Sequence, residues 1–151
     1  MKRVGVLLGC LLLCGLPAAG STAAQGEKAK GGRGDDVSKL AGEWSGESVC
    51  ADREKFPACN DERVIYRVAP APGRPDTLTI TMDKVVNGKP ETMAVFDFAY
   101  DARARTLSAE FTRNNRRGVW EFAVKGDLLE GTLTTLPDRT LVRRIRVKKD
   151  E

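Results

Sequence analysis

The chain of 151 residues contains no histidine, and only 6% of its residues are aromatic. Without an imidazole it lacks the usual general base near neutral pH and a common zinc ligand. Its one long apolar run, residues 4–16, is shorter than the roughly 20 residues that cross a bilayer as a helix. No Asn-x-Ser/Thr tripeptide predicts N-glycosylation. These absences give no support for an enzyme, a resident metal or a helical membrane protein.

Residues 1–24 have the organisation of a signal peptide. Two basic residues precede the apolar run, and Pro17 ends it ahead of a stretch of small residues. Cleavage is expected after Ala24, with Gly20 and Ala23 as alternatives. The sequence therefore predicts a secreted or periplasmic protein whose membrane contact is through this peptide alone.

Cleavage would leave about 127 residues, enough for one domain. The whole chain has a formal net charge of +4, and loss of Lys2 and Arg3 lowers it to about +2. Nucleic acid is not expected as a partner of an exported protein, despite the basic residues. Residues 25–39 are rich in Gly, Lys and Asp and predict a disordered linker, so the folded domain is expected over residues 40–149.

From Leu40 onward, apolar and polar residues alternate with the period of a β-strand. Short links with turn residues separate most of the segments, which is typical of hairpins. Closing such a meander removes its exposed edges. We therefore predict an all-β fold, an eight-stranded antiparallel up-and-down β-barrel with strands near residues 41–49, 62–69, 76–85, 92–100, 106–113, 117–125, 128–136 and 139–148.

Hairpin registers follow from the requirement that apolar residues share one face. Because a two-residue turn at Asn87-Gly88 would turn Phe96 away from that face, we expect a bulge or longer loop around Lys89-Pro90. Four further hairpins follow in chain order. The first pairs Tyr100 with Leu107 and Phe96 with Phe111, and the second pairs Phe111 with Trp120 across a 114–117 loop. The third pairs Val124 with Leu129 and Trp120 with Leu133, and the fourth pairs Leu133 with Arg143 and Thr135 with Leu141.

Gly42, Trp44 and Gly46 share one face of the first strand, so the indole has room to enter a core. On the last strand, Arg143 lies on a face that is otherwise apolar. We expect Trp44 and Arg143 to meet inside the barrel, where the first and last strands pair. The interpretation is structural, with Arg143 stacked on the indole.

Gly42-Glu43-Trp44 resembles the G-x-W motif on the first strand of lipocalins and other calycin barrels. In that family an arginine near the last strand packs over the tryptophan, the role expected of Arg143. The resemblance covers the two ends of the meander, while Tyr100-Asp101 only partly matches the T-D-Y motif of lipocalins. It implies a small apolar or amphiphilic ligand.

Inward-facing aromatic residues could line a ligand pocket or fill the barrel, and the sequence does not decide between them. For a pocket, Arg143 is the candidate counter-ion of a ligand carboxylate. The candidate ligand-binding residues are Tyr66, Phe98, Tyr100, Trp120 and Arg143.

Cys50 and Cys59 are the cysteines that would remain after cleavage, and in an exported protein they predict one disulfide between the first two strands. Two further groups of charged residues are expected to be exposed, the carboxylates because they alternate with the apolar face. Solvated carboxylates with ordinary pKa values are expected at Asp97, Glu110, Glu121 and Glu130, and a basic surface at Arg113, Arg116, Arg117, Arg144, Arg146 and Lys148.

The pattern as a whole favours an exported barrel that binds a small apolar or amphiphilic molecule. The alternative is a solid barrel that acts through its surface, as an inhibitor or a cell-envelope interaction module. Neither interpretation involves catalysis, a cofactor or a metal ion.

Overall fold

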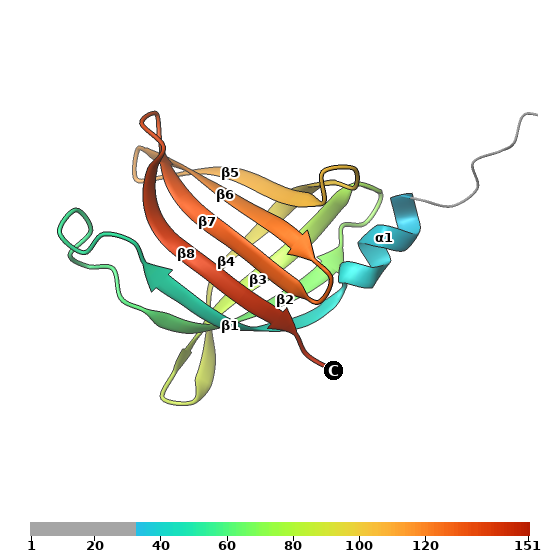
Figure 1. Ribbon diagram of the computed structural model, residues 1–151, viewed down its shortest axis with the longest axis horizontal. Helices are drawn as coiled ribbons and strands as arrows, with labels where there is room; N and C mark the ends of the chain where they lie inside the picture. Colours follow the sequence, from blue (N-terminus) through green and yellow to red (C-terminus); the bar gives the residue numbers. More distant parts are fainter. Residues whose placement is uncertain (1–32) are drawn as a thin grey trace, which may run out of the picture.

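Eight strands run up and down around a closed barrel in the computed structural model, which describes residues 33–151 (Figure 1). Neighbouring strands are antiparallel, and β1 pairs with β8 to close the cylinder. The predicted all-β, eight-stranded up-and-down barrel is confirmed, whereas the predicted signal peptide lies outside the described residues. In chain order the elements are α1 (Arg33–Leu40), β1 (Gly42–Cys50), β2 (Glu62–Pro70), β3 (Thr77–Val86), β4 (Lys89–Asp101), β5 (Thr106–Arg113), β6 (Arg116–Lys125), β7 (Leu128–Leu136) and β8 (Thr140–Lys149).

The barrel has two different ends (Figure 1). At the α1 end lie the helix, the β4–β5 and β6–β7 turns and the C-terminus. At the opposite end, here called the loop end, lie the 51–61 loop and the β5–β6 and β7–β8 turns. Within residues 33–151 no helix is long and apolar enough to span a lipid bilayer.

One aromatic cluster fills the middle of the barrel. Alternate residues of each strand point inward, and the Phe122 ring lies at the centre of the cluster. Ring centroids of Phe98, Tyr66 and Trp120 lie 5.7, 6.1 and 6.2 Å from that of Phe122. The surrounding strands add buried aliphatic side chains, including Leu78, Ile80, Met82, Leu107, Leu129 and Val147.

Several predicted pairs are confirmed. Tyr100 lies opposite Leu107, Val124 opposite Leu129, Trp120 opposite Leu133, and Leu133 opposite Arg143. In these hairpins the length of the turn fixes the register, and the apolar side chains of both strands then lie on the same face.

Two pairings near the loop end are wrong. The β5–β6 turn contains Asn114 and Asn115 alone, so Phe111 lies opposite Gly118 rather than Trp120. In the last hairpin a register shift between Leu133 and Thr134 places Thr135 opposite Thr140 instead of Leu141. The β5–β6 difference is a slip by two residues, which keeps each side chain on its face, so the alternating pattern does not exclude it. The difference in the last hairpin is one residue and arises at the register shift.

The irregularity expected between β3 and β4 exists, but it lies elsewhere. Asn87 and Gly88 form a two-residue turn with positive φ at both positions, which suits the twist of a hairpin. The register shifts at Met82 and Asp83 instead. This shift restores the inward face, with Phe96 opposite Ile80 as the apolar pattern requires.

The predicted contact between Trp44 and Arg143 is wrong. In the β1–β8 ladder Trp44 lies opposite Lys149, whereas Arg143 lies opposite Cys50. Their backbone positions therefore differ by six residues along β8, roughly 20 Å at about 3.3 Å per residue. The cation over the indole is instead that of Lys149, with Nζ 6.0 Å from the ring centroid.

The helix α1 occupies part of the stretch that was expected to be a disordered linker. It begins at Arg33, and its residues Val37 and Leu40 are buried against the barrel. Trp44 Nε1 donates a hydrogen bond of 3.0 Å to the carbonyl oxygen of Leu40. The helix thus covers the α1 end and forms part of the folded unit.

The ladder between β4 and β5 is short. It joins only three pairs, from Ala99 opposite Ser108 to Asp101 opposite Thr106. Beyond them, the Phe96 and Phe111 rings stack with centroids 5.2 Å apart. The predicted contact of these two residues is present as ring stacking rather than as a pair in the ladder.

Candidate functional site

A cavity of about 470 Å³ lies at the loop end, where the inward faces of the strands reach the mouth of the barrel. This volume falls within the usual range for small-molecule sites. The cavity combines a mainly apolar wall with three arginines. Its lining residues are Phe56, Phe111, Arg113, Asn114, Arg116, Arg117, Gly118, Leu133, Thr135 and Val142.

Gly118 lines the cavity and leaves room for the Phe111 ring. A Cβ atom on Gly118 would lie 2.5 Å from Cζ of Phe111, so any side chain here would displace that ring. The Cζ edge of the ring therefore lies against the backbone of β6 at Gly118, and Phe111 forms part of the cavity wall. Phe111 was among the aromatic residues expected on the inward face, whereas the role of Gly118 could be found only from the register.

The disulfide-closed loop places Phe56 over this mouth. The predicted Cys50–Cys59 bond is confirmed. Within the loop, Asp52 Oδ1 accepts hydrogen bonds from the backbone N–H groups of Glu54 and Lys55, and Phe56 N donates to Asp52 O. The covalent bond and these turns restrict the loop, and Phe56 forms part of the cavity wall without a ligand present.

Arg143 anchors the base of the same loop. Its Nη2 atom lies 2.9 Å from the carboxylate of Glu62 and donates to the carbonyl oxygens of Ser48 and Asn60. Its Nε donates to Ser48 Oγ at 2.7 Å. These bonds use the guanidinium within the protein, so Arg143 serves the loop and is not available as the counter-ion of a ligand.

The other four residues of the predicted ligand site are all part of the core. Tyr66, Phe98, Tyr100 and Trp120 are each at most 8% exposed, and none of them lines the loop-end cavity. The structure brings Tyr66, Phe98 and Trp120 together around Phe122. Trp120 lies directly opposite Leu133, which does line the cavity, so its indole lies next to the site.

Two polar atoms in this core have no hydrogen-bond partner within residues 33–151: the Tyr66 hydroxyl and the Trp120 indole nitrogen. The Ser48 hydroxyl lies close to Tyr66, but the geometry falls short of a hydrogen bond. Burial raises the pKa of the Tyr66 hydroxyl well above its ordinary value, and Arg143 nearby offsets part of this effect. Tyr66 is therefore a neutral residue at physiological pH.

Arg113 and Arg116 flank the tight β5–β6 turn and lie directly opposite one another in the ladder. Each continues the inward-facing series of its strand, after Phe111 in β5 and before Gly118 in β6. Positive φ angles of 51° and 59° at Asn114 and Asn115 form the two-residue turn that brings them together. The sequence indicated a basic surface here but not that both guanidinium groups would border the mouth.

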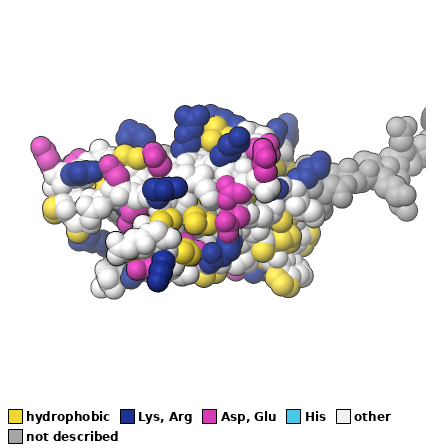
Figure 2. Space-filling model, turned by 90° about the horizontal axis from the view of Figure 1, so that it is seen from below, with side chains coloured by type: hydrophobic (Ala, Val, Ile, Leu, Met, Phe, Trp, Pro, Cys, Tyr) yellow, Lys and Arg dark blue, Asp and Glu magenta, His cyan; other side chains and the backbone are white. Residues whose placement is uncertain are grey.

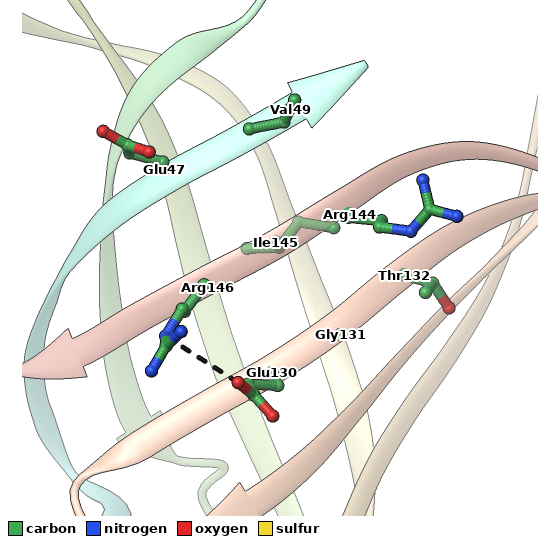
Figure 3. A pocket seen from close by; sticks show the side chains of 8 residues that line it. All are labelled: Glu47, Val49, Glu130, Gly131, Thr132, Arg144, Ile145 and Arg146. Carbon is green, nitrogen blue, oxygen red and sulfur yellow. Dashed lines mark ion pairs between the residues drawn. The ribbon is translucent and has the colours of Figure 1, made fainter. Parts of the chain in front are cut away.

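A second hollow of about 470 Å³ lies on the outer surface (Figure 3). It crosses β1, β8 and β7, and Arg146 on its rim lies 3.7 Å from Glu130. Charges of both signs border it, and both signs are also interspersed over the face seen from below (Figure 2). The residues around the outer groove are Glu47, Val49, Glu130, Gly131, Thr132, Arg144, Ile145 and Arg146.

Two surface carboxylates depart from the ordinary pKa that was expected of them. Hydrogen bonds from Thr79 and Arg74 lower the pKa of Asp97. A hydrogen bond from Lys125 lowers the pKa of Glu130. Both are solvent-facing acceptors stabilised as anions, a state that suits surface ion pairs and not proton transfer.

The sequence matches no protein-family model, and comparison with curated proteins found no match. Among solved structures, the chain is similar to a mutant of the fluorescent protein UnaG, with 12% identity over 76% of this chain and 99% of that chain, at a TM-score of 0.49. It is also similar to the siderocalin Ex-FABP, described as functioning through dual ligand specificities, with 12% identity over 75% and 71% of the two chains and a TM-score of 0.35. At this identity and overlap, the ligands of neither protein are transferred to this chain.

Proposed function

We propose that this protein is an exported barrel that binds a small apolar or amphiphilic molecule in the cavity at the loop end. The observation that carries the proposal is the pre-formed cavity of about 470 Å³ between Phe56, Phe111 and Leu133. The cavity lies between a disulfide-closed loop and the Phe111 ring, which contacts the backbone at Gly118. Contact of water with its apolar wall is unfavourable in free energy, so an apolar ligand would be stabilised there. Export is supported by the disulfide, which oxidising compartments favour.

The two tryptophans make the binding site directly testable. Trp120 lies next to the cavity, whereas Trp44 lies at the α1 end. Titration with the neutral probe N-phenyl-1-naphthylamine should change the fluorescence of a Trp44→Phe variant, which retains Trp120, and leave that of a Trp120→Phe variant unchanged. The reverse pattern, or no binding by either variant, would contradict the proposal.

Matched substitutions on β7 locate the site further. Thr135 borders the cavity and Thr132 borders the outer groove, so phenylalanine at the two positions adds the same ring to opposite faces of one strand. Thr135→Phe should weaken binding of the probe about tenfold or more, because it fills the mouth. Thr132→Phe should leave the affinity unchanged, and equal losses in both variants would place the site elsewhere.

The alternative function, a solid barrel acting through its surface, would use the outer groove. No observation favours it over the cavity, since Arg146 and Glu130 on its rim already pair with each other. It becomes the better explanation if the probe titrations find no binding at the loop end.

A further inference from the structure

The two arginines beside the β5–β6 turn lie where their positive charges repel one another. Directly opposite residues of an antiparallel pair have Cβ atoms about 4.5–5.5 Å apart, and like charges at such positions destabilise a sheet. Arg113 and Arg116 occupy one such pair. A paired carboxylate on either strand would remove the repulsion, yet within residues 33–151 neither guanidinium has an ion-pair or hydrogen-bond partner.

The neighbouring arginine differs in this respect. Arg117 Nη2 lies 2.9 Å from Glu110 Oε2, so its charge is balanced by the protein. Arg143, the arginine on the inward face of β8, is balanced by Glu62. Of the three arginines that line the cavity, Arg113 and Arg116 therefore carry the uncompensated positive charge.

We propose that the loop-end cavity takes a single-chain amphiphile with an anionic head group, a carboxylate or a phosphate, held between the guanidinium groups of Arg113 and Arg116. Its apolar part packs against Phe56, Phe111 and Leu133. Guanidinium donors match the planar geometry of such oxyanions, and these bonds are stronger than those between neutral groups. The inference rests on the proposed function and names the ligand class for the same site.

Calorimetric titration with three ligands of equal chain length tests the head group separately from the chain. Dodecanoate and dodecyl phosphate, kept below micelle formation, should bind roughly tenfold or more tightly than dodecan-1-ol at low salt. Equal affinity of all three would overturn the anionic assignment and leave the proposed function standing. Failure of all three to bind would count against the proposed function itself.

Variants assign the effect to the two residues. Arg113→Gln/Arg116→Gln should abolish the preference for the anionic ligands while retaining binding of dodecan-1-ol. The control is Arg103→Gln/Arg105→Gln, which makes the same charge change in the exposed turn at the α1 end. If this control loses the preference equally, a long-range effect of net charge explains it and the assignment to Arg113 and Arg116 fails.

A second arm distinguishes a soluble ligand from a membrane surface. Co-sedimentation with vesicles of phosphatidylcholine alone and of phosphatidylcholine with phosphatidylglycerol reports binding to anionic head groups in a bilayer. We expect the monomeric anionic amphiphiles to bind and the wild-type protein to show no preference for the anionic vesicles. Association with those vesicles without binding of monomers would overturn the proposal.

Discussion

The two ends of the barrel satisfy their polar groups in opposite ways. At the α1 end Trp44 is 1% exposed, its indole N–H is bonded to Leu40 O, and Lys149 Nζ donates to Lys39 O at 2.6 Å. At the loop end Arg113 faces Arg116 across the ladder beside a cavity. Polar and charged groups are paired at the α1 end, whereas two like charges face each other where we place the ligand. Unfavourable local arrangements of this kind are expected at functional sites.

The comparison implies a large difference in stability between matched aromatic truncations at the two ends. Trp44→Ala should lower the free energy of unfolding by about 3–5 kcal/mol, because it opens a cavity in a filled region. Phe56→Ala, at the open end, should lower it by no more than about 1 kcal/mol. Urea unfolding followed by circular dichroism measures both, and equal losses would remove the distinction between the ends.

The stapled loop provides the next test. Cys50→Ser/Cys59→Ser should lower the free energy of unfolding by about 2–3 kcal/mol, since the bond closes a loop with a sequence separation of nine residues. The same variant should bind N-phenyl-1-naphthylamine more weakly, because Phe56 is no longer held over the mouth. Unchanged probe affinity would show that the loop contributes to stability and not to the site.

Burial of Tyr66 in the aromatic cluster predicts a pH effect on stability. Its folded-state pKa is raised, so its contribution to stability is complete below about pH 10, the ordinary tyrosine pKa, and is lost as the pH rises above that value. Tyr66→Phe should remove this part of the alkaline loss. Urea unfolding of both proteins at about pH 8 and pH 11 measures this loss of unfolding free energy. An equal loss in the wild type and the variant would refute the assignment to Tyr66.

The smallest expected effect has the most direct bearing on the arginine pair. Without ligand, Arg113→Gln should raise the free energy of unfolding by about 0.2–1 kcal/mol, because it removes a like charge from directly opposite Arg116. Arg117→Gln is the control, since it breaks the ion pair with Glu110 and should lower stability by at most about 1 kcal/mol. Destabilisation by Arg113→Gln would mean that its charge is compensated in a way the static structure does not show.

Period-two alternation was sufficient to predict the strands and the closure of the barrel, because a buried face must alternate along every strand. It could not fix how far along a partner each strand lies. A shift by two residues moved Phe111 from Trp120 to Gly118 without changing its face. The same limitation explains Trp44 and Arg143, which share the interior but lie at opposite depths.

The candidate site was harder to predict than the fold. Arg113 and Arg116 were predicted to form part of a basic surface, yet their position at the mouth depends on the two-residue turn at Asn114-Asn115, where a longer loop over 114–117 was predicted. The room beside Phe111 depends on which glycine lies opposite it. Both properties arise from cross-strand pairing and are not visible in either strand alone.

The three-pair ladder between β4 and β5, here called the seam, is where the barrel wall is expected to open first. The join between the chain's first and last strands is long, while the weakest line of backbone bonding lies in the middle of the sequence. A cut in the 102–105 turn would therefore divide the protein into two four-stranded halves that still share the β1–β8 ladder. Separately produced halves should reassemble through that ladder, with the seam the first part of the wall to exchange its amide hydrogens with solvent.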